Sequence, residues 1–238
     1  MANFQTARTL LSHSLDFLLP AHCILCGLCS ESGSLCPPCR KELPRSTQSC
    51  RQCALSGIRS DVMLCGACLS RPPAWNEALA ALVYEYPVDQ LVQQFKFQRS
   101  LACGQLLADE MVLFVNQSGT VLPDVLIPVP LHFTRRFWRG FNQAEFLARR
   151  LGSRCKIPVL VNQLQRTKRT SAQSGLDRRA RKKNIRGAFS CRQLANTRVA
   201  LVDDVLTTGT TLAECARAVR AAGASNIAVW VAARVPKS

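Results

Sequence analysis

The sequence contains no long apolar run and no recognisable export signal. No stretch of about 18 uncharged apolar residues occurs, so we expect no membrane-spanning helix. The apolar segment 9–20 is interrupted by His13 and Asp16, and no small-residue cleavage site follows it. A secretory signal peptide would need an uninterrupted apolar stretch and a small-residue cleavage site after it. We therefore expect this segment to form a short amphipathic helix of the mature protein.

Acidic residues are also scarce. The chain has 15 Asp and Glu against 31 Lys and Arg, a net charge of +16. Nearly all of this excess lies between residues 133 and 192, where seventeen basic residues face only Glu145 and Asp177. Aromatic residues stand among these arginines, namely Phe133, Phe137, Trp138 and Phe141. Cations with stacking aromatics suit single-stranded nucleic acid, whereas a solvated charged surface with core aromatics is the alternative.

Cysteine is abundant by contrast, and nine of the 13 cysteines lie between Cys23 and Cys68. Eight of them form four Cys-x-x-Cys knuckles, and two knuckles complete a four-thiolate zinc site. Because no secretion signal is present, metal binding is favoured over disulfides. The candidate ligands are Cys23, Cys26, Cys36 and Cys39 for one ion, and Cys50, Cys53, Cys65 and Cys68 for a second.

This pairing of consecutive knuckles is the simplest one, and a cross-braced pairing remains open. A closed four-thiolate site has no position for substrate, so we expect two structural zinc ions, with an iron–sulfur cluster as the competing occupant. Cys29 is a spare thiol, and His22 is expected to be a surface or packing residue. The scattered Cys103, Cys155, Cys191 and Cys215 are expected to behave as small buried hydrophobic residues.

The sequence divides after Pro73, where a short proline-containing linker ends a cysteine-rich segment. We predict a zinc-ribbon domain over 1–73 and a second domain over 74–238. In the second domain, strands alternate with helices, which indicates an α/β fold with a parallel sheet. The expected strands are 78–86, 125–130, 158–164, 198–202 and 226–235, and the expected helices are 88–97, 101–115, 142–152 and 210–222.

The most informative segment is the strand at 198–202, which runs directly into Asp203 and Asp204. Open α/β sheets bind ligands at the carboxyl ends of their strands. A turn rich in hydroxyl groups follows at 207–211, just before a helix whose N-terminal N–H groups suit an anion. The two acids could bind sugar hydroxyls, and the turn beside them could bind a phosphate. Together they predict a sugar-phosphate site. The alternative is an acidic strand end before an ordinary capped helix.

This stretch resembles the ribose-phosphate fingerprint of type I phosphoribosyltransferases. The resemblance implies that Asp203 and Asp204 hold the ribose hydroxyls of phosphoribosyl pyrophosphate (PRPP) and act in catalysis. It further implies that the loop wraps the 5-phosphate, through Thr207, Thr208, Gly209, Thr210 and Thr211, and that Mg²⁺ accompanies PRPP.

Two basic segments are the candidates for binding pyrophosphate or DNA. The first follows the strand that ends at Pro130 and includes Arg135, Arg136 and Arg139, with His132 more readily explained as structural than as a base. The second is a polar loop that includes Arg166 and Arg169. Departing pyrophosphate needs such cations and N–H donors.

Taken in order, the cysteine knuckles, Pro128-Val-Pro130, Arg139-Gly-Phe-Asn-Gln143, the basic loop and the Asp-Asp fingerprint resemble the ComF family over essentially the whole chain. The resemblance implies a cytoplasmic protein that binds PRPP and handles imported single-stranded DNA, for natural transformation or for use as a nutrient. It also implies partner proteins of the DNA-uptake or helicase kind. The alternative is a phosphoribosyltransferase of nucleobase salvage, although no element that would recognise a base is evident.

Overall fold

The computed structural model describes residues 22–30, 34–59, 61–131, 140–167 and 185–237. The chain forms two compact units, 1–43 and 44–238. The expected N-terminal helix at 9–20 lies outside the described residues. Among the described residues, no helix is both long and apolar enough to cross a membrane.

The first unit is organised around two tight turns that carry cysteines. The Cys23 turn is closed by a hydrogen bond from the Gly27 N–H to the Cys23 carbonyl, at 2.9 Å. Helix α2 (Pro37–Lys41) begins directly after Cys36, with proline in its first turn, where the missing N–H costs no helical hydrogen bond. Both turns therefore present pairs of cysteine side chains on short, rigid segments of chain.

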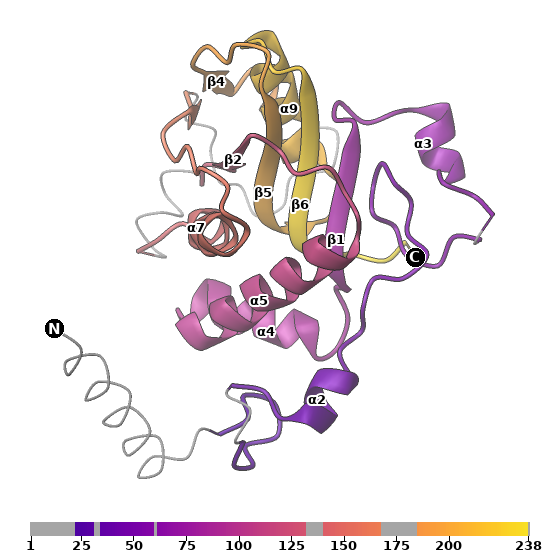
Figure 1. Cartoon of the computed structure of the whole chain (residues 1–238), viewed down its shortest axis with the longest axis vertical. Coiled ribbons are helices and arrows are strands. Elements are labelled where there is room, and N and C mark those ends of the chain that lie inside the picture. The colour runs from indigo at the N-terminus through magenta and orange to yellow at the C-terminus, as the bar shows by residue number, and fades with distance from the viewer. Residues whose placement is uncertain (1–21, 31–33, 60, 132–139, 168–184, 238) are drawn as a thin grey trace, which may run out of the picture. The chain divides into compact units, whose positions relative to one another are not determined.

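The second unit contains a four-stranded parallel sheet, which confirms the predicted fold class. Its strands are β1 (Glu77–Val83), β2 (Val125–Pro128), β5 (Arg198–Leu206) and β6 (Asn226–Arg234), in the order β1-β6-β5-β2 (Figure 1). Strands β5 and β6 pair from Arg198↔Asn226 to Leu206↔Arg234, so their carboxyl ends finish at one edge of the sheet.

Helices cover both faces of this sheet. Helices α5 (Leu101–Gln117) and α7 (Gln143–Cys155) pack on one face, and α4 (Val88–Phe97) packs against α5. Helix α9 (Thr210–Ala221) lies on the other face, behind β5 and β6 in the view of Figure 1. The four helices expected from apolar periodicity are confirmed, with ends that differ by up to three residues.

One expected strand is wrong in its extent. Residues 158–164 contribute only an isolated bridge, between Val159 and Leu126. The strand in this region is instead β3 (Leu164–Arg166), which pairs antiparallel with β4 (Phe189–Cys191) as a separate hairpin sheet. Apolar residues near Pro158 gave a strand-like pattern. The backbone bonds between this segment and β2 are limited to two, in which the Leu126 N–H donates to the Pro158 carbonyl and the Leu160 N–H donates to the Leu126 carbonyl. The basic loop expected at 171–186 lies almost wholly outside the described residues.

Alternation along β5 determines which side chains face which helices. Val199 and Leu201 pack in the core that also contains Leu212 and Cys215 of α9. Because successive strand residues point to opposite faces, Ala200 and Val202 point toward the α5 and α7 side. All four strand residues are 0–1% exposed, so the strand that carries the two acids is held rigidly on both faces.

Candidate functional site

The two predicted acids lie inside strand β5 rather than after it, because the strand continues to Leu206. Asp203 and Asp204 are neighbours in an extended strand, so their side chains project to opposite faces of the sheet edge. The Asp203 Oδ1 atom accepts a hydrogen bond from the Asp204 N–H at 2.9 Å. This bond fixes the first carboxylate against the backbone of the second.

Asp204 has a cationic partner that the sequence reasoning missed. The ammonium of Lys96, on α4, lies 2.8 Å from Asp204 Oδ1, and the two side chains are only 20% and 11% exposed. Lys96 lies four residues after the buried Val92 and next to the buried Phe95. A lysine on the apolar stripe of a helix is therefore the signal that could have identified it.

Asp203 lies on the α9 side, within electrostatic reach of a buried thiol. Burial raises the pKa of Cys215 well above its ordinary value; the charge of Asp203 raises it further, and that of Arg166 opposes this. Arg166 also lies over the ring of Phe189, with its guanidinium carbon 5.5 Å from the ring centroid. The predicted cation Arg166 thus belongs to the same side of the sheet as Asp203.

The threonine loop follows β5 and ends in the first turn of α9. Gly209 precedes the helix with φ +72°, a left-handed conformation that glycine adopts without strain. Thr208 and Thr210 place their hydroxyl oxygens 3.0 Å apart, and Thr207 and Thr208 are exposed. No side chain caps this helix. The N–H groups of its first turn, which have no intrahelical acceptor, point out of the helix beside the threonine hydroxyls.

The remaining predicted cations, Arg135, Arg136, Arg139 and Arg169, lie outside the described residues, as do His132, Phe133, Phe137 and Trp138. Beyond residue 139, the structure describes the start of α7. Asn142 caps α7 by accepting from the Ala144 N–H at 3.1 Å and donates to the Val129 carbonyl at 3.2 Å. The Asn142 side chain thus connects the N-terminus of α7 to Val129, the residue directly after β2.

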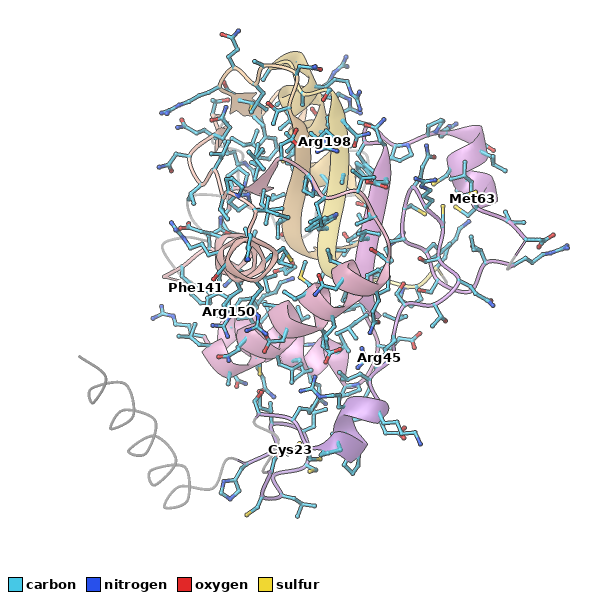
Figure 2. The ribbon with its side chains drawn as sticks, viewed as in Figure 1. Cys23, Arg45, Met63, Phe141, Arg150 and Arg198 are labelled. Atoms are coloured by element: carbon cyan, nitrogen blue, oxygen red, sulfur yellow. The ribbon has the colours of Figure 1, made fainter. Side chains whose placement is uncertain are left out.

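Phe141 is not a free stacking platform. Its ring lies beside α7 (Figure 2) and packs against Phe95 and Phe146, with centroid separations of 5.5 and 6.5 Å. Of the four aromatics singled out in the basic stretch, the one that the structure describes therefore belongs to an aromatic cluster, in which Phe95 is fully buried and Phe141 is half-buried.

The eight knuckle cysteines form two clusters, and both match the pairing of consecutive knuckles. Within each cluster the four sulfur atoms lie within 4.8 Å of one another; the clusters are Cys23, Cys26, Cys36, Cys39 and Cys50, Cys53, Cys65, Cys68. The Sγ atoms of Cys26 and Cys36 are 3.7 Å apart, and those of Cys53 and Cys65 are 3.6 Å apart. Tetrahedral zinc with Zn–S bonds of about 2.3 Å requires sulfur separations of about 3.8 Å. Both clusters therefore fit zinc.

Backbone N–H groups support the thiolate form of one cysteine in each cluster. Burial raises the pKa of Cys50, but N–H groups of Cys65, Cys53 and Gln52 outweigh it and lower the pKa to about 7. The Cys65 N–H lies 3.3 Å from Cys50 Sγ. In the first cluster, burial is likewise outweighed by N–H groups, and the pKa of Cys23 falls to about 6. Donors directed at sulfur are what a metal-binding thiolate needs.

Cys29 and His22 belong to neither cluster. The Cys29 sulfur lies 3.9 Å from Nε2 of His22, and both side chains are exposed. Of the scattered cysteines, Cys103 and Cys215 are buried as expected, whereas Cys155 and Cys191 are only half-buried.

Comparison with known proteins supports both halves of this description. Residues 14–69 match the double zinc ribbon domain, and residues 138–238 match the phosphoribosyl transferase domain. The chain is 37% identical to competence protein F of Haemophilus influenzae, over 89% of this chain and 96% of that protein. The chain belongs to the ComF family.

The chain is also similar to two proteins with other names. The chain is 33% identical to the DNA utilization protein YhgH of Salmonella typhimurium, over 91% of this chain and 98% of that protein. It is 26% identical to competence protein ComFC of Bacillus subtilis, over 78% of this chain and 71% of that protein.

Proposed function

We propose that this ComF family protein binds PRPP at the carboxyl ends of β5 and β6 and handles imported single-stranded DNA in the cytoplasm. The observation that carries the first part is the meeting of Asp203 and Asp204 with the uncapped N-terminus of α9 at one end of strand β5. In this proposal the carboxylates orient the ribose hydroxyls, and the loop at 207–211 receives the 5-phosphate.

The pyrophosphate end of the ligand would meet cations. Lys96 already lies at Asp204, and the arginines of segments 132–139 and 166–169 would supply further positive charge. When bound with PRPP, Mg²⁺ would neutralise pyrophosphate charge. Asp203 and Asp204 are the carboxylates that would face it.

The DNA part of the proposal rests on the relatives and on charge. The relatives are named for competence and DNA utilization. Seventeen basic residues lie between 133 and 192, and a basic surface of that density binds phosphate backbones. Partner proteins of the DNA-uptake machinery belong to this proposal, and natural transformation and nutritional use of DNA are both compatible with it.

Calorimetric titration with PRPP and Mg²⁺ tests the site. Replacing Asp203 and Asp204 by Asn should weaken binding at least a hundredfold, because each carboxylate accepts charge-assisted hydrogen bonds. Asp124→Asn is the matched control, since this carboxylate precedes β2 and is paired with Arg198, the first residue of β5. Unchanged affinity in the double variant would remove the site assignment.

The second candidate function is catalysis, which the match to the phosphoribosyl transferase domain favours. An active transferase would release pyrophosphate from PRPP when a panel of purified nucleobases is supplied. A DNA-handling protein would instead bind single-stranded oligonucleotides with an affinity that falls steeply with salt. Running both assays on one preparation separates the two functions.

A further inference from the structure

In the second cysteine cluster, three consecutive backbone carbonyls of the first knuckle accept hydrogen bonds from the rest of the domain. The Arg51 carbonyl accepts from the Ala78 N–H at 2.9 Å, the Gln52 carbonyl from Trp75 Nε1 at 2.6 Å, and the Cys53 carbonyl from Arg234 Nε at 2.9 Å. The sulfur atoms of the same turn face the metal position. One short turn therefore has a side that faces the metal position and a side that is bonded to the rest of the domain.

Arg234 continues this connection to the phosphate loop. Its Nη1 atom donates to the carbonyls of Leu206 and Thr207, each at 2.8 Å, while Nε holds Cys53. A single planar guanidinium thus joins the cysteine knuckle to the first residue of the threonine loop. Its geometry is fixed, so a shift of the knuckle is transmitted to the loop rather than absorbed.

Trp75 makes a second, independent connection. A Cβ atom on Gly209 would lie 2.8 Å from Cη2 of Trp75, so the loop backbone rests directly on the indole ring. The ring is 5% exposed, and its N–H is held by the Gln52 carbonyl. Ala54, the residue after the knuckle, is fully buried in the same core cluster as Trp75 and Leu206.

We propose that Trp75 and Arg234 are positioning residues that couple metal binding at Cys50, Cys53, Cys65 and Cys68 to the conformation of the loop at 207–211. With the second cluster metallated, the knuckle holds the loop ready for a phosphate group. Without the metal, both connections loosen and the loop loses its order. Only the consequence for PRPP affinity rests on the proposed function; the ordering of the loop does not.

Amide hydrogen exchange on the zinc-loaded, full-length protein tests the coupling without any ligand. Cys68→Ser removes the fourth ligand of the second cluster, and Cys39→Ser removes the corresponding ligand of the first. We expect the hydrogen-bonded amides of Ala213 and Val235, whose acceptors are the Gly209 and Leu206 carbonyls, to exchange at least tenfold faster in Cys68→Ser, since an opened connection costs about one to two hydrogen bonds. In Cys39→Ser, and at 143–155 of α7 in both variants, exchange should stay unchanged.

Two further variants leave the zinc ligands intact, so they keep the test valid if Cys68→Ser fails to fold. Arg234→Gln and Trp75→Phe should each accelerate exchange of the Ala213 and Val235 amides about fivefold or more while zinc content remains two per chain. Their controls are Arg198→Gln, at the start of β5, and Trp230→Phe, whose indole N–H has no partner among the described residues. Unchanged loop exchange in Cys68→Ser, or in both Arg234→Gln and Trp75→Phe, would overturn the coupling.

PRPP titration of the same variants separates this inference from the proposed function. If wild-type protein binds PRPP, Arg234→Gln should bind it about tenfold more weakly with an intact carboxylate pair. If wild-type protein binds no PRPP but the loop still exchanges faster in Cys68→Ser, the proposed ligand is wrong and the coupling stands.

Discussion

Lys96 of α4 lies 2.8 Å from Asp204 of β5, and this pair joins two elements that are far apart in sequence at the centre of the candidate site. Both side chains are mostly buried, so neither charge is well solvated. The carboxylate that we propose to meet ribose hydroxyls is thus already paired with a cation before any ligand binds.

Removing the lysine tests this relationship. Lys96→Met should lower the free energy of unfolding by about 1–3 kcal/mol, because Asp204 loses a charged partner in a site that water barely reaches. Urea unfolding measures the change. The double variant Lys96→Met/Asp204→Asn should recover much of the loss, since it leaves no unpaired charge.

The control for this pair is an exposed one. Arg149 pairs with Glu145 across one turn of α7, with 61% and 26% of the two side chains exposed. Arg149→Met should cost less than about 0.5 kcal/mol. Equal losses in Lys96→Met and Arg149→Met would show that burial gives the Lys96 pair no special weight.

Gly209 offers a second prediction, because two separate constraints act on it. Its φ is +72°, and a Cβ would lie 2.8 Å from Trp75. Gly209→Ala should cost about 2–4 kcal/mol, the sum of left-handed strain and overpacking. Gly57 has φ +76° with open space around it, so Gly57→Ala should cost only about 1 kcal/mol. Thermal or urea unfolding of the two variants isolates the contact with Trp75.

Metal content is the third prediction. Elemental analysis should find about two zinc ions per chain, with one lost in Cys68→Ser and one in Cys39→Ser. Because structural zinc supplies much of the folding free energy of such small segments, a strong chelator should lower the unfolding temperature. One ion per chain in the wild type would mean that one of the two clusters does not hold zinc.

A pH dependence follows from the ion pair at the start of β5. The Arg198 side chain and N–H, both bonded to Asp124, lower the pKa of that carboxyl below its ordinary value. A carboxyl with a lowered pKa stabilises the fold above the ordinary value of about 4, and this contribution is lost as pH falls through the lowered value. The stability difference between wild type and Asp124→Asn should therefore shrink toward zero between about pH 5 and pH 2. A difference that stays constant over this range would show that the charge of Asp124 contributes nothing.

The sequence by itself determined the family, the parallel α/β sheet and the two groups of four cysteines. These features are written in local patterns, because knuckle spacing, apolar periodicity and the Asp-Asp-threonine motif each lie within a few residues of chain. The same patterns predicted α4, α5, α7 and α9 nearly to their ends. They failed at 158–164, where an apolar run beside Pro158 looked like a strand but forms only a bridge to Leu126, and the strand β3 begins at Leu164.

Only the tertiary structure decided which residues meet at the site. Lys96 reaches Asp204 because α4 packs beside α5 on the sheet face to which Asp204 points, a relationship that spans more than 100 residues of sequence. Arg234 reaches the loop because β6 pairs with β5 as far as Leu206↔Arg234, whereas Trp75, which precedes β1, reaches Gly209 through its indole ring. No local pattern encodes such contacts, since they arise from the order of strands in the sheet. The sequence named the chemistry of the Asp-Asp loop, and the fold determined what holds that loop in place.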